Sequence, residues 1–296
     1  MATYPVMQVD AFTDKPLNGN PCAVVFETDQ LDEAVMLAVS REMNLSETAF
    51  VRDSPIADFG VRFFTPAEEI PLAGHPTIAT VFALIDSGRL KLTDDFMMIS
   101  LELKHGPIPV EIFSKNGSVQ QIVMNQRKPE FFSKHDPKIV LPIFGLTEKE
   151  LLADFPIQTV STGTRQLMVP LRSLEALRAI SFNVTAYEEF RAKADFFSPH
   201  LFCLRGITEE GMTFARHFGC PPDLPEDPFT GSATGGMAAY LWHYGLIEQP
   251  KFTAEQGHWM SRPGRAFVEV IGPPEDMKTV KVGGQAVTVV RGELII

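Results

Sequence analysis

Two short segments place small and hydroxylated residues where helices are expected to begin. They read Gly74-His75-Pro76-Thr77 and Thr230-Gly231-Ser232-Ala233. The start of a helix has unpaired backbone N–H groups and the positive end of the helix dipole, so it can bind an anion such as a carboxylate. The alternative is ordinary capping, in which hydroxyls such as those of Thr77, Thr230 and Ser232 satisfy these N–H groups. For either segment considered alone, we favour ordinary capping. For the two segments considered together, we favour an anion site.

Three titratable side chains could carry acid–base chemistry near these helix starts. A helix N-terminus lowers the pKa of a histidine such as His75 and favours a neutral ring that donates one hydrogen bond and accepts another. Asp227 precedes the second segment, and Glu47 opens an apolar strand in Ser46-Glu47-Thr48-Ala49-Phe50. The alternative for each carboxylate is a surface charge, and Asp227 could also be a turn or cap residue.

Other catalytic motifs are absent from the sequence. There is no Gly-x-Gly-x-x-Gly after a strand, no Walker lysine and no His-Glu-x-x-His, and the seven histidines show no metal-ligand spacing, so nothing indicates a metal site. The run from Gly231 to Gly235 has the spacing of a nucleophile elbow. Because Pro-rich residues rather than a strand precede it, a serine hydrolase is a minor alternative.

Short strands and a few helices must position these residues. Apolar residues at helical spacing predict helices, and runs rich in β-branched and aromatic residues predict strands. The segment 75–87 is apolar nearly all round, which is typical of a helix buried in a core, and Gly88 would end it. The predicted helices cover 31–43, 75–87 and 187–194, with another running to Gly245; the predicted strands cover 6–12, 23–26, 48–51, 58–64, most of 96–125, 157–161 and 167–171.

The two apolar helices have matching spacing in the sequence. Gly74 and Gly231 are 157 residues apart, and the glycines that end the two helices, Gly88 and Gly245, are also 157 residues apart. Coincidence is the alternative, since glycine is common at helix ends. We favour an internal duplication, which predicts two similar lobes with a cleft between them.

Composition bounds the class of protein. A length of 296 residues suggests about two domains, and a formal charge of −11 argues against nucleic-acid binding, which needs clustered Lys and Arg. Three widely spaced cysteines, Cys22, Cys203 and Cys220, argue against a disulfide scaffold. Because no signal peptide or apolar run of membrane-spanning length is readable, we expect a cytoplasmic protein without membrane contact.

A series of short motifs, in this order, resembles the PhzF family of phenazine biosynthesis-like isomerases, which have the diaminopimelate epimerase-like fold. The match runs through nearly the whole chain, and each string alone is weak. The strings are Val9-Asp10-Ala11-Phe12-Thr13, Gly19-Asn20-Pro21, Ser46-Glu47-Thr48-Ala49-Phe50, Arg62-Phe63-Phe64-Thr65-Pro66, Gly74-His75-Pro76-Thr77, Ser161-Thr162-Gly163, Arg216 with Phe218, Glu226-Asp227-Pro228-Phe229-Thr230-Gly231-Ser232-Ala233, Glu255-Gln256-Gly257 and Arg262-Pro263-Gly264-Arg265.

The resemblance implies an α+β fold of two similar lobes, each a curved mixed β-sheet or barrel around a central α-helix. We expect an N-terminal lobe over 1–127, to which a last strand at 284–296 returns, and a C-terminal lobe over 128–283. It also implies a homodimer that requires no cofactor and no metal. The active site would lie between the lobes, with Glu47 as the catalytic acid/base. The predicted substrate-binding residues are Asn20, Gly74, His75, Asp227, Thr230, Gly231 and Ser232.

At the two helix starts this sequence differs from the diaminopimelate epimerases of the same fold, and the difference bears on the mechanism. Diaminopimelate epimerases of this fold use two cysteines at the helix starts, whereas Ala73 and Thr230 precede the two glycines here. Epimerisation or racemisation by two thiols is therefore disfavoured. The sequence predicts a cofactor-independent isomerase that moves a proton between carbons of a small anionic organic acid. The alternative from another class is a non-catalytic small-acid binding protein on the same scaffold.

Overall fold

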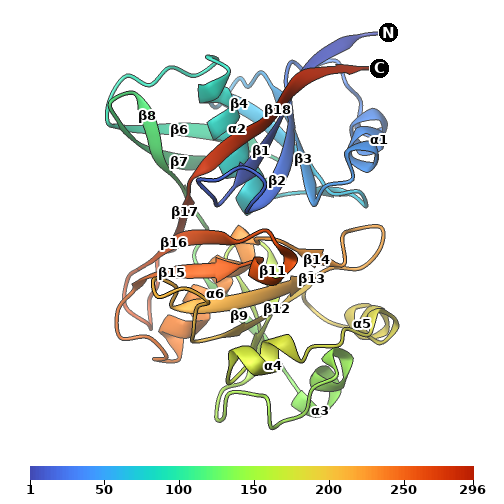
Figure 1. Ribbon diagram of the computed structural model, residues 1–296, viewed down its shortest axis with the longest axis vertical. Helices are drawn as coiled ribbons and strands as arrows, with labels where there is room; N and C mark the ends of the chain where they lie inside the picture. The colour runs from blue at the N-terminus through green and yellow to red at the C-terminus, as the bar shows by residue number, and fades with distance from the viewer.

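Two lobes, one above the other in Figure 1, make up the computed structural model, which describes residues 1–296. Each lobe contains β-strands curved around one buried helix of 13 residues. This arrangement confirms the predicted α+β class, with two similar lobes and a central helix in each.

The upper lobe is formed by the first part of the chain and by its last strand. Its central helix α2 packs against β1, β2, β3, β8 and β18. The elements are β1 (Thr3–Ala11), β2 (Asn20–Val25), α1 (Glu33–Met43), β3 (Glu47–Arg52), β4 (Phe59–Phe64), β5 (Glu69–Ile70), α2 (Gly74–Asp86), β6 (Phe96–Leu103), β7 (Gly106–Lys115), β8 (Ser118–Asn125) and β18 (Ala286–Ile295).

The lower lobe repeats this plan around α6, which packs against β10, β11, β12, β16 and β17. Its elements are β9 (Glu130–His135), α3 (Pro137–Val140), η1 (Leu141–Phe144), β10 (Ile157–Ser161), β11 (Arg165–Pro170), α4 (Leu174–Arg178), α5 (Val184–Arg191), β12 (Ser198–Cys203), β13 (Thr213–Phe218), β14 (Glu226–Asp227), α6 (Gly231–His243), β15 (Lys251–Gln256), η2 (His258–Met260), β16 (Gly264–Ile271) and β17 (Thr279–Gly284).

The chain crosses between the lobes twice, after β8 and after β17. At this junction β17 pairs with β8, so that one continuous sheet extends through both lobes. The last strand, β18, then runs antiparallel to β1 along its whole length, from Thr3 opposite Ile295 to Ala11 opposite Ala286. The boundaries at 127/128 and 283/284 stay a prediction.

The matched helices are present at the predicted spacing. Helices α2 and α6 both have 13 residues and begin at Gly74 and Gly231. Gly88 and Gly245 follow them with φ of +76° and +65°, the left-handed conformation that ends many helices. Ile78 in α2, like its neighbours in the core, is fully buried, and burial of such a side chain contributes roughly 1.5–3 kcal/mol.

The secondary structure differs from the sequence-based expectation at two places. Residues 126–150 contain β9, α3 and η1, so the crossing between the lobes after β8 is short. The helix predicted over 187–194 is α5, which begins earlier because the Asn183 side chain accepts a hydrogen bond from the N–H of Ala186 and caps it. Strand β12 was not predicted, since Ser198-Pro199-His200 interrupts its apolar pattern, although all six residues are buried.

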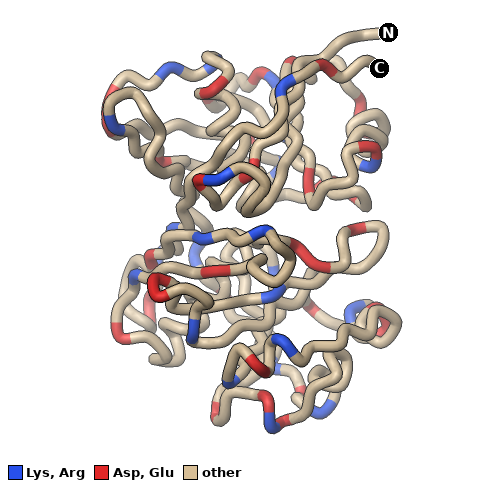
Figure 2. The backbone as a smooth tube through the Cα atoms, in the orientation of Figure 1, with Lys and Arg blue, Asp and Glu red and all other residues tan.

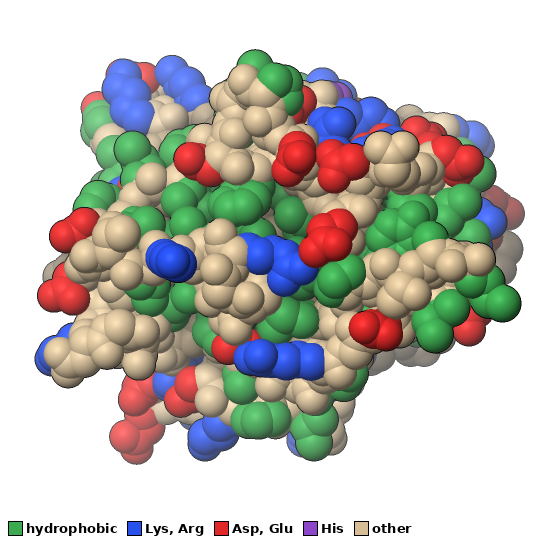
Figure 3. Space-filling view, turned by 90° about the horizontal axis from the view of Figure 1, so that it is seen from above, with side chains coloured by type: hydrophobic (Ala, Val, Ile, Leu, Met, Phe, Trp, Pro, Cys, Tyr) green, Lys and Arg blue, Asp and Glu red, His purple; other side chains and the backbone are tan.

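The surface carries charges of both signs. Lys and Arg are dispersed among Asp and Glu over both lobes rather than gathered on one face (Figure 2). The end of the molecule seen in Figure 3 mixes hydrophobic side chains with acidic and basic ones. None of the helices is both long and apolar enough to cross a bilayer.

Candidate active site

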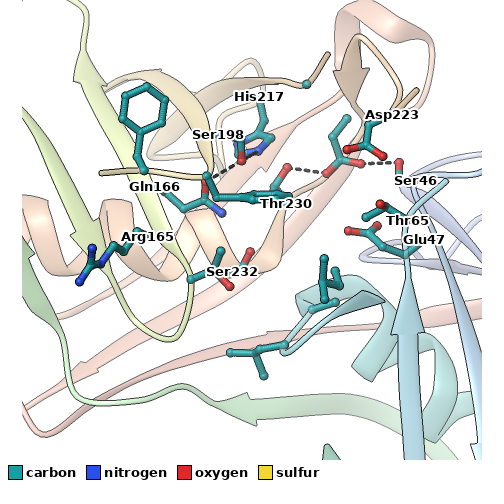
Figure 4. A pocket seen from close by; sticks show the side chains of 18 of the residues that line it. Ser46, Glu47, Thr65, Arg165, Gln166, Ser198, His217, Asp223, Thr230 and Ser232 are labelled. Atoms are coloured by element: carbon teal, nitrogen blue, oxygen red, sulfur yellow. Dashed lines mark hydrogen bonds between the residues drawn. The ribbon is translucent and has the colours of Figure 1, made fainter. Parts of the chain in front are cut away.

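A cavity of about 590 Å³ lies between the two lobes (Figure 4). The upper lobe contributes residues around the start of β3 and the segment 65–73, and the lower lobe contributes β11, the segment 191–198 and the start of α6. Among the predicted site residues, Glu47, Asp227, Thr230 and Ser232 line this cavity.

The other predicted site residues lie behind the cavity wall. Gly74, His75, Gly231 and Asn20 are buried, with exposed fractions of 2% for His75 and 0% for Asn20. The structure therefore brings all eight predicted residues into one region, but only four of them reach the cavity surface.

The starts of α2 and α6 touch directly. A Cβ added at Gly74 would lie 2.7 Å from the Cα of Gly231 and 2.7 Å from the backbone nitrogen of Ser232, so a side chain at position 74 does not fit. Neither helix has a side-chain cap. The hydroxyls proposed as alternatives bind elsewhere: Thr77 donates to the carbonyl of Ala73, and Thr230 donates to Asp227. The first-turn N–H groups of both helices thus converge beside the cavity without a capping side chain.

Glu47 and His75 form an isolated acid–base pair. Oε2 of Glu47 lies 3.3 Å from Nε2 of His75, and neither atom has another hydrogen-bond partner. Burial raises the pKa of Glu47 well above its usual range, and the nearby carboxylates of Asp227 and Asp223 raise it further. Burial lowers the pKa of His75 to about 4, although the charge of Asp227 opposes this effect. His75 is therefore neutral at neutral pH, and it adds no positive charge beside Glu47.

Asp227 is the hydrogen-bond centre of the site. Its Oδ1 accepts from Ser46 Oγ at 2.6 Å, and its Oδ2 accepts from Thr230 Oγ1 at 2.5 Å (Figure 4). The Oδ1 atom also accepts from Asn20 Nδ2 at 2.8 Å. Because Asn20 and Ser46 belong to the upper lobe, these bonds also tie the lobes together.

Asn20 was predicted to bind substrate, but its place in the structure supports another role. Its Nδ2 lies within hydrogen-bond distance of Asp227 Oδ1, of the carbonyl oxygen of Phe229 and of His75 Nδ1. With these contacts and no exposure to the cavity, Asn20 orients His75 and Asp227. We propose that it is a positioning residue.

One donor atom from each of Glu47, His75 and Asp227 lies within 4.8 Å of the other two, which is close enough for three ligands of one cation. Both carboxylate oxygens of Asp227 already accept hydrogen bonds from uncharged donors. The arrangement therefore fits a hydrogen-bonded acid–base cluster better than a metal site, and the absence of a metal stays a prediction.

A second set of contacts holds the two lobes together. The rings of Phe12 and Phe229 stack with centroids 4.3 Å apart. Arg262 donates to Asp10 at 2.7 Å and also to the carbonyl oxygens of Asn18 and Gly19. The carboxyl of Asp10 is only 1% exposed, so the lower lobe supplies its counter-charge.

Several cavity residues were not predicted from the sequence. Thr65 falls within a quoted family string, but Gln166, Ser198, His217 and Asp223 had no signal, since single polar residues in apolar strands or loops form no motif. In Figure 4 Gln166, Ser198 and His217 face Glu47 from across the cavity.

The positions of the cysteines and of Ser232 argue against thiol chemistry and against a serine hydrolase at this cavity. All three cysteines are buried, and none lines the cavity. Cys22 lies opposite Glu47 in the β2–β3 pairing, and burial, reinforced by Glu47, raises the pKa of its thiol well above the usual range. Both ring nitrogens of His75 face other partners, Asn20 and Glu47, so this histidine is not placed to activate Ser232 as in a serine hydrolase.

Comparison with known proteins connects this geometry to a family. The family model for phenazine biosynthesis-like protein (PhzC-PhzF) matches residues 9–292. The uncharacterized isomerase YfhB of Bacillus subtilis is 35% identical over 267 residues, covering 90% of each chain. The trans-2,3-dihydro-3-hydroxyanthranilate isomerase of Pseudomonas fluorescens is 34% identical over 294 residues, covering 97% of this chain and 98% of the relative. A PhzF-family phenazine biosynthesis protein of Bacillus anthracis superposes with a TM-score of 0.87 at 31% identity, covering 100% of both chains.

Proposed function

The chain belongs to the phenazine biosynthesis-like (PhzF) family of isomerases, and from that premise we propose that it moves a proton between two carbon atoms of a small carboxylate-bearing substrate, with Glu47 as the acid/base. The observation that carries the proposal is the placement of Glu47, which lines the cavity while its buried Oε2 faces only His75.

The environment of Glu47 suits proton transfer to and from carbon. A carboxylate with a raised pKa is a stronger base when ionised, and once protonated it holds the proton until the substrate takes it back at another carbon. Burial and the nearby Asp227 raise the pKa in this way. Neutral His75 on the far side of Glu47 keeps the carboxyl oriented and adds no positive charge that would lower this pKa.

The helix starts supply the complementary electrostatics. Removing a proton from carbon next to a carboxylate pushes negative charge onto the carboxylate oxygens. Uncapped N–H groups at the starts of α2 and α6, with the Ser232 hydroxyl beside them, would stabilise that charge as preorganised donors. No redox step or added group is required by this sequence of events.

Exchange of substrate hydrogen with solvent tests the proposal. The named relative makes trans-2,3-dihydro-3-hydroxyanthranilate the first compound to try, followed by related small acids, in deuterated water with detection by NMR. Since a positioned acid/base contributes about 10²–10⁴-fold, Glu47→Gln should slow exchange by that factor. Glu42→Gln, a change of the same kind at an exposed position, is the control. Exchange at wild-type rate in Glu47→Gln would overturn the proposal.

Two further parts of the prediction stay open to direct measurement. The homodimer and the cytoplasmic location remain predictions from the family resemblance and the sequence. A non-catalytic binding protein and a two-thiol racemase have no observation in their favour, because the relatives are isomerases and the thiols lie away from the cavity.

A further inference from the structure

Four side chains of the lower lobe form a hydrogen-bonded chain that ends at the cavity. His200 Nδ1 lies 3.2 Å from His217 Nδ1, and His217 Nε2 lies 2.8 Å from Ser198 Oγ. Ser198 Oγ donates to Gln166 Oε1 at 2.7 Å. All four residues are buried, with exposed fractions between 0% for His200 and 5% for His217. None of them takes part in the acid–base cluster of Glu47, His75 and Asp227.

Every hydrogen bond in this series of four side chains is donated in the same direction, from His200 toward Gln166. Burial lowers the pKa of His200 well below its usual range and that of His217 to about 4, so each ring is neutral and carries a single N–H. At the end of the hydrogen-bonded series farthest from Gln166, the Nε2 atom of His200 is buried and has no hydrogen-bond partner. A buried N–H without a partner is rarer than an unpartnered lone pair, so the hydrogen of His200 sits on Nδ1 and points to His217.

This direction fixes the amide of Gln166. His217 receives a hydrogen bond at Nδ1 and donates from Nε2 to Ser198, and Ser198 donates to the amide oxygen of Gln166. The NH₂ group of Gln166 is then left without a protein partner. Figure 4 shows the amide oxygen turned toward Ser198 and the nitrogen turned into the cavity.

The same wall carries two arginines. Arg165 and Arg191 line the cavity and stack on the rings of Phe132 and Phe197, at 4.0 and 5.0 Å from the ring centroids, rather than on carboxylates. Of the acids nearby, Asp195 already accepts from the Thr159 hydroxyl and from the backbone N–H of Ser133, and Asp223 interacts with the charge of Arg191. The NH₂ group of Gln166 is therefore the donor on this wall that has no protein acceptor.

We propose that Gln166, held as a donor by the Ser198–His217–His200 chain and with the cation of Arg191 in the same cavity, forms a second subsite that binds an anionic oxygen group of the substrate. The substrate class is then a small diacid, whose first carboxylate lies at the starts of α2 and α6 and whose second lies at Gln166. The assignment of the first carboxylate rests on the proposed function. A compound such as trans-2,3-dihydro-3-hydroxyanthranilate, which has one carboxylate, would leave the second subsite without its anion.

Unreactive aromatic acids test the subsite by calorimetry. The probes are benzoate, benzene-1,3-dicarboxylate and 3-(aminomethyl)benzoate, which share one carboxylate and differ in the second group. A hydrogen bond to a charged group contributes about 1.5–3 kcal/mol, so wild type should bind the dicarboxylate at least about tenfold more tightly than benzoate. The aminomethyl probe should bind more weakly than benzoate.

Substitutions at Gln166 distinguish the donor from mere shape. Gln166→Met keeps the size and removes the donor, so it should bring the dicarboxylate within about twofold of benzoate and leave the benzoate affinity unchanged. Gln166→Glu should reverse the preference toward the aminomethyl probe. Ser198→Ala releases the amide to rotate and should reduce the dicarboxylate preference while leaving Gln166 in place. Equal preferences in wild type and Gln166→Met, or a wild-type preference for the aminomethyl probe, would overturn the subsite. Since these probes do not react, a failure of hydrogen exchange through Glu47 would leave this result readable.

Discussion

Replacement of Gly74 by alanine tests whether direct contact between the two helix starts sets the geometry of the cavity. The added methyl would lie 2.7 Å from the Cα of Gly231 and from the nitrogen of Ser232, and 2.8 Å from the carbonyl carbon of Gly231. Carbon atoms pack at about 3.5–4.0 Å, so the backbones must move apart by roughly 1 Å. All three neighbours are backbone atoms, which cannot rotate away as a side chain would.

The opening should reduce activity more than stability. Glu47 and the α2 start belong to the upper lobe, while Asp227, Ser232 and the α6 start belong to the lower lobe, so the displacement separates groups that act together. A misplacement of about 1 Å can cost about 10²-fold in rate, and overpacking of this kind costs about 1–3 kcal/mol of stability. The rate is measured by solvent hydrogen exchange of the substrate, and stability by urea unfolding followed by circular dichroism.

Two other glycines provide a graded comparison. A Cβ at Gly231 would first meet the ring of Phe12, at 2.8 Å, and would lie 3.1 Å from the Cα of Gly74, so Gly231→Ala should be less damaging than Gly74→Ala. A Cβ at Gly292 would meet nothing within 4 Å, so Gly292→Ala should behave as wild type. A Gly74→Ala protein with wild-type exchange rate and stability would refute the argument that contact between these backbones fixes the site.

Two predictions concern stability alone. Because burial lowers the pKa values of His75 and His217 from about 6.5 to about 4, each ring reduces stability by on the order of 3 kcal/mol as the pH falls from 6.5 toward 4. His200, whose pKa is also lowered, acts in the same direction, and Glu47, whose pKa is raised, acts in the opposite direction. Urea unfolding of wild type and His217→Gln between pH 7 and 4 should therefore differ by the contribution of one ring, and an identical pH dependence in the two proteins would contradict the assignment. Arg262→Met leaves Asp10 buried without its counter-charge and should cost about 3–5 kcal/mol, part of which Asp10→Asn should restore in the double variant. A loss below 1 kcal/mol in the same unfolding assay would mean that the pair does not hold the lobes together.

The elements that could be predicted are those whose structure is determined by residues close together in the sequence. Helix α2 could be predicted because an all-round apolar run between Gly74 and Gly88 has few other solutions, and the 157-residue repeat extended that reasoning to α6. Strand β12 could not, because its Pro199 and His200 are stabilised by parallel pairing with β11, a contact between distant segments.

The site residues also fall into a group that could be predicted from local sequence and a group that could not. Glu47, His75 and Asp227 lie in motifs at element boundaries and were predicted together. Gln166 is a single amide in an apolar strand, and its role depends on a chain of partners from β12 and β13 that no local pattern encodes. The hydroxyl of Thr230, considered as a helix cap, instead donates to the carboxylate of Asp227 and accepts from Gln256 Nε2, so its oxygen accepts from a side chain of β15 rather than from the helix.

The pairing of β18 with β1 has a consequence for synthesis on the ribosome. The lower lobe, from β9 to β17, is one continuous stretch and can fold as soon as it emerges. The upper lobe waits for the last strand, because until β18 arrives the edge of β1 is bare and α2 lacks part of its cover. The first domain therefore stays incomplete until β18 has been synthesised, although its other strands and α2 emerge first.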